Sequence, residues 1–221
     1  MFNIFTEEFL LQLVLTLPGL LVAITFHEFA HAYVADKLGD DTPRYQGRIT
    51  LNPLAHLDPV GTFLLVFARF GWGKPVEISP KNFKCKMSTG EALVSVAGPL
   101  MNFMLAIVFL LIYGILYKIQ INTKLGLILN TMIFYGASIN VALGVFNLIP
   151  LPPLDGSKIL MHYLPYNARN WFIQNQQIFY VVFIIIFVTG TSSYIISPII
   201  GGVFNFLYNI MALIFGLPKM V

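Results

Sequence analysis

The segment from residue 10 to residue 26 carries no charged side chain, and Gln12 is its only strongly polar residue. It continues into His27-Glu28-Phe29-Ala30-His31 with no turn signal between the two. An apolar run of this kind predicts a membrane-spanning helix. Because ionisable groups at membrane depth are energetically costly, the two imidazoles and the carboxylate at its end are candidates for a functional site.

The spacing of His27 and His31 fits a metal site on a helix. Positions i and i+4 lie on one helical face, so both imidazoles can bind the same ion. Glu28 follows His27 directly and lies beside such a site, where it could take a proton from a metal-bound water. The alternative is that all three side chains are simply solvated at the end of a helix.

The composition indicates a membrane protein. Of the 221 residues, 57% are hydrophobic and 10% are charged, whereas soluble domains carry roughly 25% charged residues. The formal net charge of +3 is too small to suggest a nucleic-acid partner. The single cysteine, Cys85, indicates neither a disulfide nor a cysteine-based zinc cluster. The region before the first apolar segment is basic in signal peptides, but here it contains Glu7 and Glu8. We therefore interpret this segment as a membrane span that is retained and not as a cleaved signal.

We expect an all-α polytopic membrane protein with about five spanning helices, organised as a single membrane domain over residues 1–221. Its catalytic core would cover about residues 9–158 and its C-terminal helices about residues 170–221. Residues 60–70 are apolar but fall short of the roughly 20 residues that cross a bilayer, so they predict a short re-entrant helix. The predicted spans are residues 9–38, 91–117, 125–149, 178–196 and 199–217. Residues 46–51 and 75–78 predict a small β-hairpin or strand element near the cytosolic face.

Charged residues predict the orientation in the membrane. The amino-terminal segment holds Glu7 and Glu8 and no basic side chain. The stretch between the first helix and Glu91 is basic, with Lys37, Arg44, Arg48, Arg69, Lys74, Lys81, Lys84 and Lys86. Because loops rich in Lys and Arg stay in the cytosol, we expect the N-terminus outside and this stretch inside, provided that residues 60–70 do not cross. The chain would then be a multi-pass protein of the cell membrane with its candidate site toward the cytosolic side.

An open catalytic zinc site needs a third protein ligand. The predicted helices over residues 9–38 and 125–149 run in the same direction, and Asp155 follows the second, so it should reach the depth of His27 and His31. Asp155 could equally cap a helix that begins at Gly156. Asp58 is the main rival, and the residues alone leave both aspartates open. The remaining candidates are His56, Asp36 and Glu77.

Small and polar side chains share one face of each of two predicted spans. Ser95, Gly98 and Asn102 share a face of one helix, and Asn140 and Asn147 share a face of the next. Such faces let helices approach closely, and asparagines hydrogen-bond across helices. In the alternative, these asparagines support the zinc ligands or contact the substrate. Asn140 or Asn147 would then hold the substrate backbone or a developing oxyanion.

The loop over residues 52–59 is dense in polar groups, among them His56 and Asp58. Its asparagine, aspartate and prolines are typical of a turn at the membrane surface. The functional alternative is that His56 and Asp58 support the zinc ligands, or that the loop is a platform for a substrate strand.

Three motifs together resemble the site-2 proteases, which are intramembrane zinc metalloproteases that cut the transmembrane segments of other proteins. The motifs are His27-Glu28-x-x-His31, Ala97-Gly98-Pro99-x-x-Asn102 and Asn147-Leu148-Ile149-Pro150-Leu151-Pro152-Pro153-Leu154-Asp155-Gly156. The loop over residues 52–61 is similar to that of the compact prokaryotic branch, without PDZ or nucleotide-sensing domains. The resemblance implies that His27, His31 and Asp155 bind one zinc ion per chain, that Glu28 activates the zinc-bound water, and that three helices form the catalytic core near the cytosolic face.

The predicted function is therefore a zinc-dependent intramembrane endopeptidase whose partners are a transmembrane substrate and the lipid bilayer. The oligomeric state is left open. A metal transporter or channel is the first alternative, but it would need ionisable groups repeated along a pathway. A non-catalytic metal-binding membrane partner is the second, and it would not need Glu28. Membrane proteases that take a glutamate as third ligand are a third, but neither Glu77 nor Glu91 has a matching context.

A transmembrane substrate must unwind before hydrolysis, because its peptide groups are engaged in helical hydrogen bonds. An extended peptide is held well by pairing with an exposed strand edge. We therefore expect residues 46–51 or 75–78 to pair with the substrate, assisted by Asn140 or Asn147.

Overall fold

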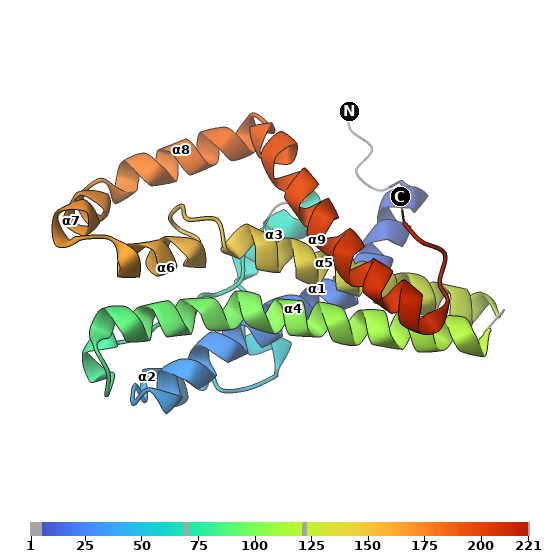
Figure 1. Cartoon of the computed structure of the whole chain (residues 1–221), viewed down its shortest axis with the longest axis horizontal. Coiled ribbons are helices and arrows are strands. Elements are labelled where there is room, and N and C mark those ends of the chain that lie inside the picture. Colours follow the sequence, from blue (N-terminus) through green and yellow to red (C-terminus); the bar gives the residue numbers. More distant parts are fainter. Residues whose placement is uncertain (1–5, 69–70, 121–122, 221) are drawn as a thin grey trace.

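The computed structural model describes residues 6–68, 71–120 and 123–220, and these fold almost entirely into helices (Figure 1). The elements are α1 (Glu7–Lys37), α2 (Thr42–Tyr45), η1 (Pro53–Ala55), α3 (Pro59–Ala68), η2 (Pro80–Asn82), α4 (Met87–Ile119), α5 (Lys124–Asn147), α6 (Asp155–Tyr163), α7 (Tyr166–Gln174), α8 (Gln176–Val188) and α9 (Thr191–Phe215). The prediction of a helical protein is confirmed.

Among the described residues, four helices are long and apolar enough to span a bilayer, namely α1, α4, α5 and the part of α9 from Ser193 to Phe215. The predicted span over residues 178–196 is not confirmed. That run divides between α8, which has 13 residues, and the start of α9. Gly190 adopts a left-handed φ of 72° at the division, a backbone conformation that glycine reaches at little cost and that ends a helix.

Helix α1 begins and ends at signals that the sequence carries. The hydroxyl of Thr6 accepts a hydrogen bond from the backbone N–H of Phe9, which caps the amino-terminal end. Leu38 is the last residue with helical backbone angles, and Gly39 follows with a φ of +105°. The predicted end of the first span at residue 38 is confirmed to within one residue, and α1 runs through Pro18 as one helix.

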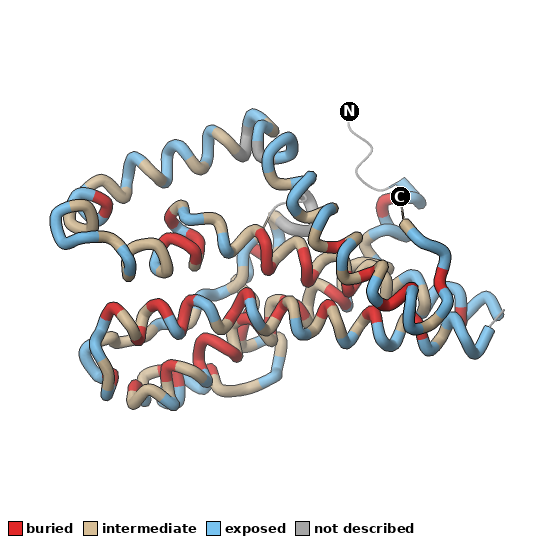
Figure 2. The backbone as a smooth tube through the Cα atoms, viewed as in Figure 1, coloured by how far each residue is buried: buried red, intermediate tan, exposed pale blue. Residues whose placement is uncertain are grey.

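Helices α1, α4 and α5 contact one another and form the central layer of the molecule. Glycines let α1 and α5 cross closely, because a Cβ atom added to Gly19 would lie 2.6 Å from the Cα atom of Gly136. Figure 2 shows that buried residues gather between these helices and that the outer faces are exposed. Large apolar side chains such as Leu11, Leu127 and Ile184 are among those exposed, as expected for surfaces that face lipid.

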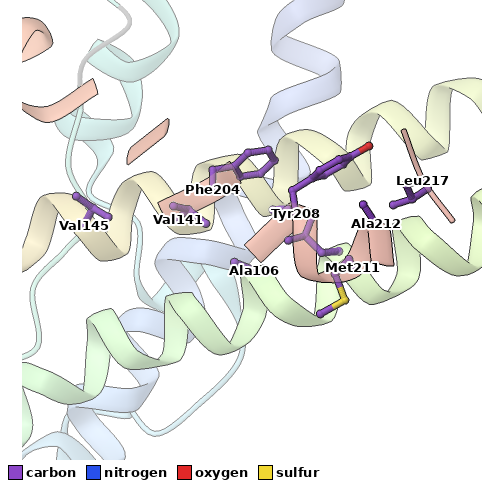
Figure 3. Close-up of a cluster of buried hydrophobic side chains, with 10 residues drawn as sticks. Ala106, Val141, Val145, Phe204, Tyr208, Met211, Ala212 and Leu217 are labelled. Carbon is purple, nitrogen blue, oxygen red and sulfur yellow. The ribbon is translucent and has the colours of Figure 1, made fainter. Parts of the chain in front are cut away.

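Helix α9 packs across α4 and α5, away from the histidines, in a cluster of buried side chains (Figure 3). Phe204 and Tyr208 of α9 stand against Phe134 of α5 with ring centroids 5.4 and 6.2 Å apart. Tyr113 of α4 joins the same group, 5.4 Å from Phe134. This cluster fixes α9 to the core, whereas α8 reaches outward over the end of α5 (Figure 1).

The predicted strand over residues 46–51 is wrong. Gln46 caps α2, Gly47 has a φ of +65°, and no strand forms within the described ranges. Within those ranges one isolated bridge joins Leu57 to Gly73. The backbone of the segment bonds locally, since the N–H of Arg48 donates to the carbonyl of Pro43 and the carbonyl of Thr50 accepts from His56. The buried guanidinium of Arg48 points inward and donates to the carbonyls of Ala55 and Lys74. These groups are satisfied without a strand partner.

The apolar segment over residues 60–70 forms α3 as far as Ala68, while residues 69–70 lie outside the described residues. With ten residues α3 is too short to cross a bilayer. Asp58 accepts a hydrogen bond from the N–H of Gly61 at 2.7 Å and so caps its first turn. The re-entrant insertion of α3 stays a prediction.

Candidate metal centre

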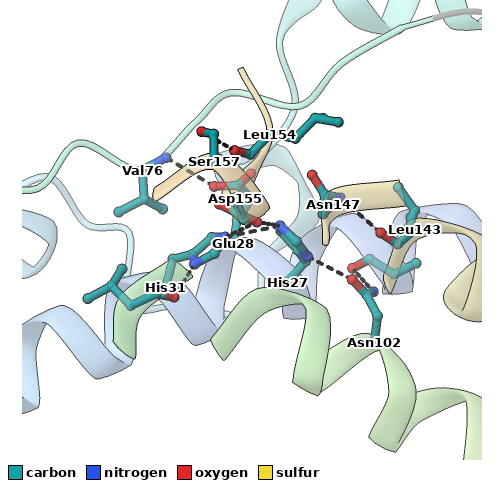
Figure 4. Close-up of polar contacts among 12 residues, drawn as sticks. His27, Glu28, His31, Val76, Asn102, Leu143, Asn147, Leu154, Asp155 and Ser157 are labelled. Atoms are coloured by element: carbon teal, nitrogen blue, oxygen red, sulfur yellow. Dashed lines mark hydrogen bonds and ion pairs between the residues drawn. The ribbon is translucent and has the colours of Figure 1, made fainter. Parts of the chain in front are cut away.

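The structure brings His27, His31 and Asp155 together from two elements far apart in the sequence (Figure 4). The two imidazoles project from successive turns of α1, with their Nε2 atoms 3.0 Å apart. The Oδ2 atom of Asp155, the first residue of α6, lies 3.2 Å from each Nε2 atom. All three side chains are nearly buried, with 10% to 14% of their surface exposed.

A glycine permits α6 to fold back to this position. The chain leaves α5 at Asn147 and reaches Asp155 through a tight turn. A Cβ atom on Gly156 would lie 2.3 Å from the carbonyl oxygen of Leu148, so only glycine fits there. The close return places the carboxylate of Asp155 over α1.

Hydrogen bonds fix which nitrogen of each imidazole is available. The Nδ1 atom of His31 lies 2.7 Å from the carbonyl oxygen of Val94, an atom that can only accept, so Nδ1 carries the proton. The Nδ1 atom of His27 lies 2.7 Å from Oδ1 of Asn102. That amide is oriented by its Nδ2 group, which donates to the carbonyl of Ala23 and to Oδ1 of Asn140. Both Nε2 lone pairs are therefore free to bind a metal ion.

The donor set fits zinc. Imidazole nitrogens and a carboxylate oxygen bind this ion at about 2.0–2.2 Å in tetrahedral geometry, which separates the donors by about 3.3–3.6 Å. The separations of 3.0, 3.2 and 3.2 Å are slightly shorter than this range. Among the described residues, these three form the one group of His, Cys, Asp and Glu side chains with this convergence. Three ligands leave one tetrahedral position open.

The charge of Asp155 and the packing around the histidines both suit metal binding. Burial raises the pKa of Asp155, but the adjacent His31 and His27 lower it by more, so its carboxyl stays ionised. Gly98 of α4 closes the site from the opposite side. A Cβ atom at this position would lie 2.5 Å from Nε2 of His31 and 2.6 Å from Cε1 of His27. The close helix contact predicted for Gly98 is therefore a contact with the two imidazole rings.

Glu28 lies beside the three donors without joining them. Its Oε2 atom accepts a hydrogen bond of 3.0 Å from the backbone N–H of Val76, in the segment without helix or strand that follows Gly73 (Figure 4). Glu28 and His27 line two cavities, and Asn147 and Pro153 line both as well. Glu28 is thus a carboxylate in contact with open space at the metal centre.

The two cavities differ in character. One, of about 160 Å³, is lined by polar groups that include His31, Ser95, Asp155 and Lys158. The other, of about 350 Å³, has mainly apolar walls that include Ile24, Trp72, Leu143, Phe146 and Phe183. A peptide that occupied both would pass from apolar to polar surroundings at Glu28.

The asparagines predicted from the helix faces take different places. Asn102 and Asn140 are fully buried, and Asn140 donates to the carbonyl of Gly136 at 2.8 Å. They form a chain of hydrogen bonds behind His27 and do not line either cavity. Asn147 does line both cavities, and its amide donates to the carbonyl of Leu143 at 3.0 Å.

His56 and Asp58 do not join the metal centre. His56 is fully buried in its loop, and burial lowers its pKa, so the ring is neutral and its Nε2 group donates to the carbonyl of Thr50 at 2.8 Å. Asp58 caps α3. Both residues therefore support the loop and the start of α3. Asp58, the rival third ligand, is not part of the group formed by His27, His31 and Asp155.

Two groups at the site were missed by the sequence analysis. The backbone N–H of Val76 could not have been found, because any residue type supplies it. Lys158 could have been found, since it lies three residues after Asp155 on the same helical face.

Similarity to known proteins extends over most of the chain. The model of Peptidase family M50 matches residues 15–132 and 114–190. "Putative zinc metalloprotease YwhC" of Bacillus subtilis is 41% identical over 184 residues, which cover 82% of this chain and 84% of the relative. "Putative zinc metalloprotease Rip2" of Mycobacterium tuberculosis is 28% identical over 181 residues, covering 80% and 68%. No solved structure gives a significant match.

Proposed function

This chain belongs to peptidase family M50 and is a multi-pass membrane zinc metalloprotease of the site-2 type, and from that premise we propose how its residues perform the reaction. His27, His31 and Asp155 bind one zinc ion per chain. Glu28 is the general base, and the substrate is a peptide bond in or near a transmembrane segment. The observation that carries the proposal is the convergence of these three donors beside a cavity-lining glutamate.

A bound zinc ion supplies a Lewis acid that polarises a carbonyl and makes a water molecule nucleophilic near neutral pH. Glu28 takes one proton from the attacking water as the new C–O bond forms. It then passes that proton to the leaving amine as the C–N bond breaks. Oε2 of Glu28 is held by Val76, while Oε1 makes no hydrogen bond with any described residue and is available for the proton.

Asn102 and Val94 act through the two histidines. Asn102 and Val94 accept hydrogen bonds from the Nδ1–H groups of the two rings. They thereby hold each ring with Nε2 toward Asp155 and keep the metal-binding lone pair available. Asn140 extends this support by accepting from the amide of Asn102. We infer that these groups orient the metal ligands and that Asn147, which lines both cavities, is the asparagine that contacts the substrate.

Neither segment considered for substrate pairing forms a strand, but Pro75, Val76 and Ile78 line the smaller cavity, whereas no residue of 46–51 lines either cavity. The N–H of Val76 points to Glu28, so a peptide pairing with this edge would run past the general base. We therefore propose residues 75–78 as the edge that holds the unwound substrate. The alternative of a metal transporter would need several metal sites along a pathway, whereas the described residues contain one group of potential metal donors.

We expect purified protein in liposomes to cut a single-span substrate inside its apolar segment. Mass spectrometry of the products identifies the cleaved bond. A zinc chelator should stop cleavage, and added zinc should restore it. Cleavage confined to soluble loops, or cleavage that continues unchanged after zinc removal, would contradict this proposal.

We also propose that the N-terminus lies outside and the metal centre toward the cytosolic side, as the basic loop between α1 and α4 indicates. With Cys85 replaced by serine, a cysteine introduced at the exposed Asn82 should react only from the cytosolic side. A cysteine at Lys118, near the other end of α4, should react only from the opposite side. The reversed pattern would contradict this orientation.

A further inference from the structure

The smaller cavity at the metal centre has two polar groups for which the proposed reaction has no use. They belong to two residues of its lining, Ser95 on α4 and Lys158 on α6. We propose that they form a subsite that binds an acidic side chain of the substrate next to the scissile bond. This inference rests on the proposed function and adds a specificity to it.

Lys158 is a cation in the lining of the smaller cavity. It lies three residues after Asp155 on the nine-residue helix α6, so both side chains project from one face of that helix. Its ammonium group makes no ion pair or hydrogen bond with any residue in the described ranges. Lys158 is exposed to solvent on one side, and it also lines the cavity that His31 and Asp155 line.

Ser95 supplies a second, independent observation. Its side chain is fully buried, and its Oγ atom has no hydrogen-bond partner among the described residues. A serine inside a helix commonly donates to the carbonyl four residues earlier, but Ser95 does not. A buried hydroxyl left without a partner is unfavourable unless another molecule supplies one. Because Ser95 lines the cavity, that partner is a group bound there.

The charges of the cavity favour an anion. Glu28 and Asp155 are its two carboxylates, and a divalent metal ion held by His27, His31 and Asp155 would offset both of them. Lys158 then remains as an uncompensated positive charge. A carboxylate would pair with Lys158 and accept a hydrogen bond from Ser95, whereas a basic side chain would be repelled.

The size of the cavity indicates how much of the substrate it holds. A volume of about 160 Å³ is well below the roughly 300–1,000 Å³ typical of sites for whole small ligands. One side chain fits, together with the peptide bond at the metal centre. The inferred ligand is thus the side chain of an aspartate or glutamate within a few residues of the cleaved bond.

The test uses liposome-embedded protein and a single-span substrate whose cleaved bond is known. Glu, Gln or Lys is placed in turn at the three positions on either side of that bond. At one of these positions, wild-type protein should prefer Glu over Gln by about tenfold in kcat/KM, mostly through KM. Lys158→Gln should remove the preference, and Lys158→Glu should reverse it so that the Lys substrate is cut best.

Controls separate this subsite from other effects. Lys118→Glu makes the same charge change near the far end of α4 and should keep the wild-type preference. Ser95→Ala should weaken the preference severalfold without lowering thermal stability, because no hydrogen bond within the described residues is lost. Zinc content should stay unchanged in the Ser95 and Lys158 variants.

Binding can be measured separately from cleavage. Glu28→Gln protein loaded with zinc should bind a Glu-containing peptide more tightly than its Gln counterpart, and the added Lys158→Gln should abolish the difference. Equal binding and equal cleavage of Glu, Gln and Lys substrates would overturn the subsite while leaving the protease function intact. An equal fall in kcat for all substrates in Lys158→Gln would also overturn it, since that result assigns Lys158 to the reaction itself. Absence of any cleavage by zinc-loaded wild-type protein would instead overturn the proposed function.

Discussion

Glu28→Gln is expected to abolish peptide cleavage, with kcat reduced by about 10²–10⁴-fold, while the protein keeps its zinc and its fold. The amide preserves the size of the side chain and can still lie next to the N–H of Val76, but it cannot take a proton from water. Cleavage in liposomes gives the rate, and metal analysis of the same sample gives the zinc content.

Glu77→Gln is the matched control for this loss. Glu77 follows Val76 directly in the same segment. Its carboxylate accepts a hydrogen bond from Gln46 and is not part of the group of metal donors. This variant should retain near wild-type cleavage. If Glu28→Gln also cleaves at a rate near that of the wild type, Glu28 is not the base.

Asp155→Ala is expected to lower the affinity for zinc by more than about 100-fold. Groups that merely orient metal ligands contribute about 10–100-fold to affinity, so the loss of a ligand should exceed that range. The variant leaves two imidazoles with Nε2 atoms 3.0 Å apart and no carboxylate between them. Competition with a zinc-binding dye measures the affinity, and circular dichroism confirms that the helices remain.

Asp58→Ala supplies the comparison, because sequence alone left Asp58 as the rival third ligand. Its carboxylate caps α3 through the N–H of Gly61. Its removal should therefore lower the free energy of unfolding by about 1 kcal/mol and leave the zinc content unchanged. Zinc loss from Asp58→Ala together with retention in Asp155→Ala would reverse the assignment.

Much of the helical core could be predicted from the sequence, because local signals decide it. The apolar runs set the spans, and the spacing of His27 and His31 places both rings on one face of α1. Helix α1 ends just before Gly39, and glycine is the residue type that most often takes the positive φ at the end of a helix. Such features depend on residues close together in the chain.

Other features depend on contacts between distant residues. The sequence predicts a strand over residues 46–51, but Arg48 turns inward and satisfies the loop carbonyls instead. It predicts a continuous span over residues 178–196, but Gly190 divides the run into α8 and α9. These outcomes follow from backbone conformation and side-chain direction, which hydropathy does not encode.

The residues around the metal centre also could not be assigned their contacts from the sequence. Helix periodicity identifies Ser95, Gly98 and Asn102 as one face, but it does not say what that face touches. The structure places Gly98 against the imidazole rings, hydrogen-bonds Asn102 to His27 and puts Ser95 on the cavity wall. A role for each residue emerges only after α1, α4 and α6 are brought together.

X-ray absorption at the zinc edge of the purified wild-type protein would report most directly whether His27, His31 and Asp155 hold a catalytic zinc ion. We expect one zinc per chain with nitrogen and oxygen ligands only, two of them imidazoles, at about 2.0–2.2 Å in a four-coordinate site. Asp155→Ala should remove this signal. A folded protein without zinc, a sulfur ligand from Cys85, or a third imidazole in place of the carboxylate would contradict the assignment.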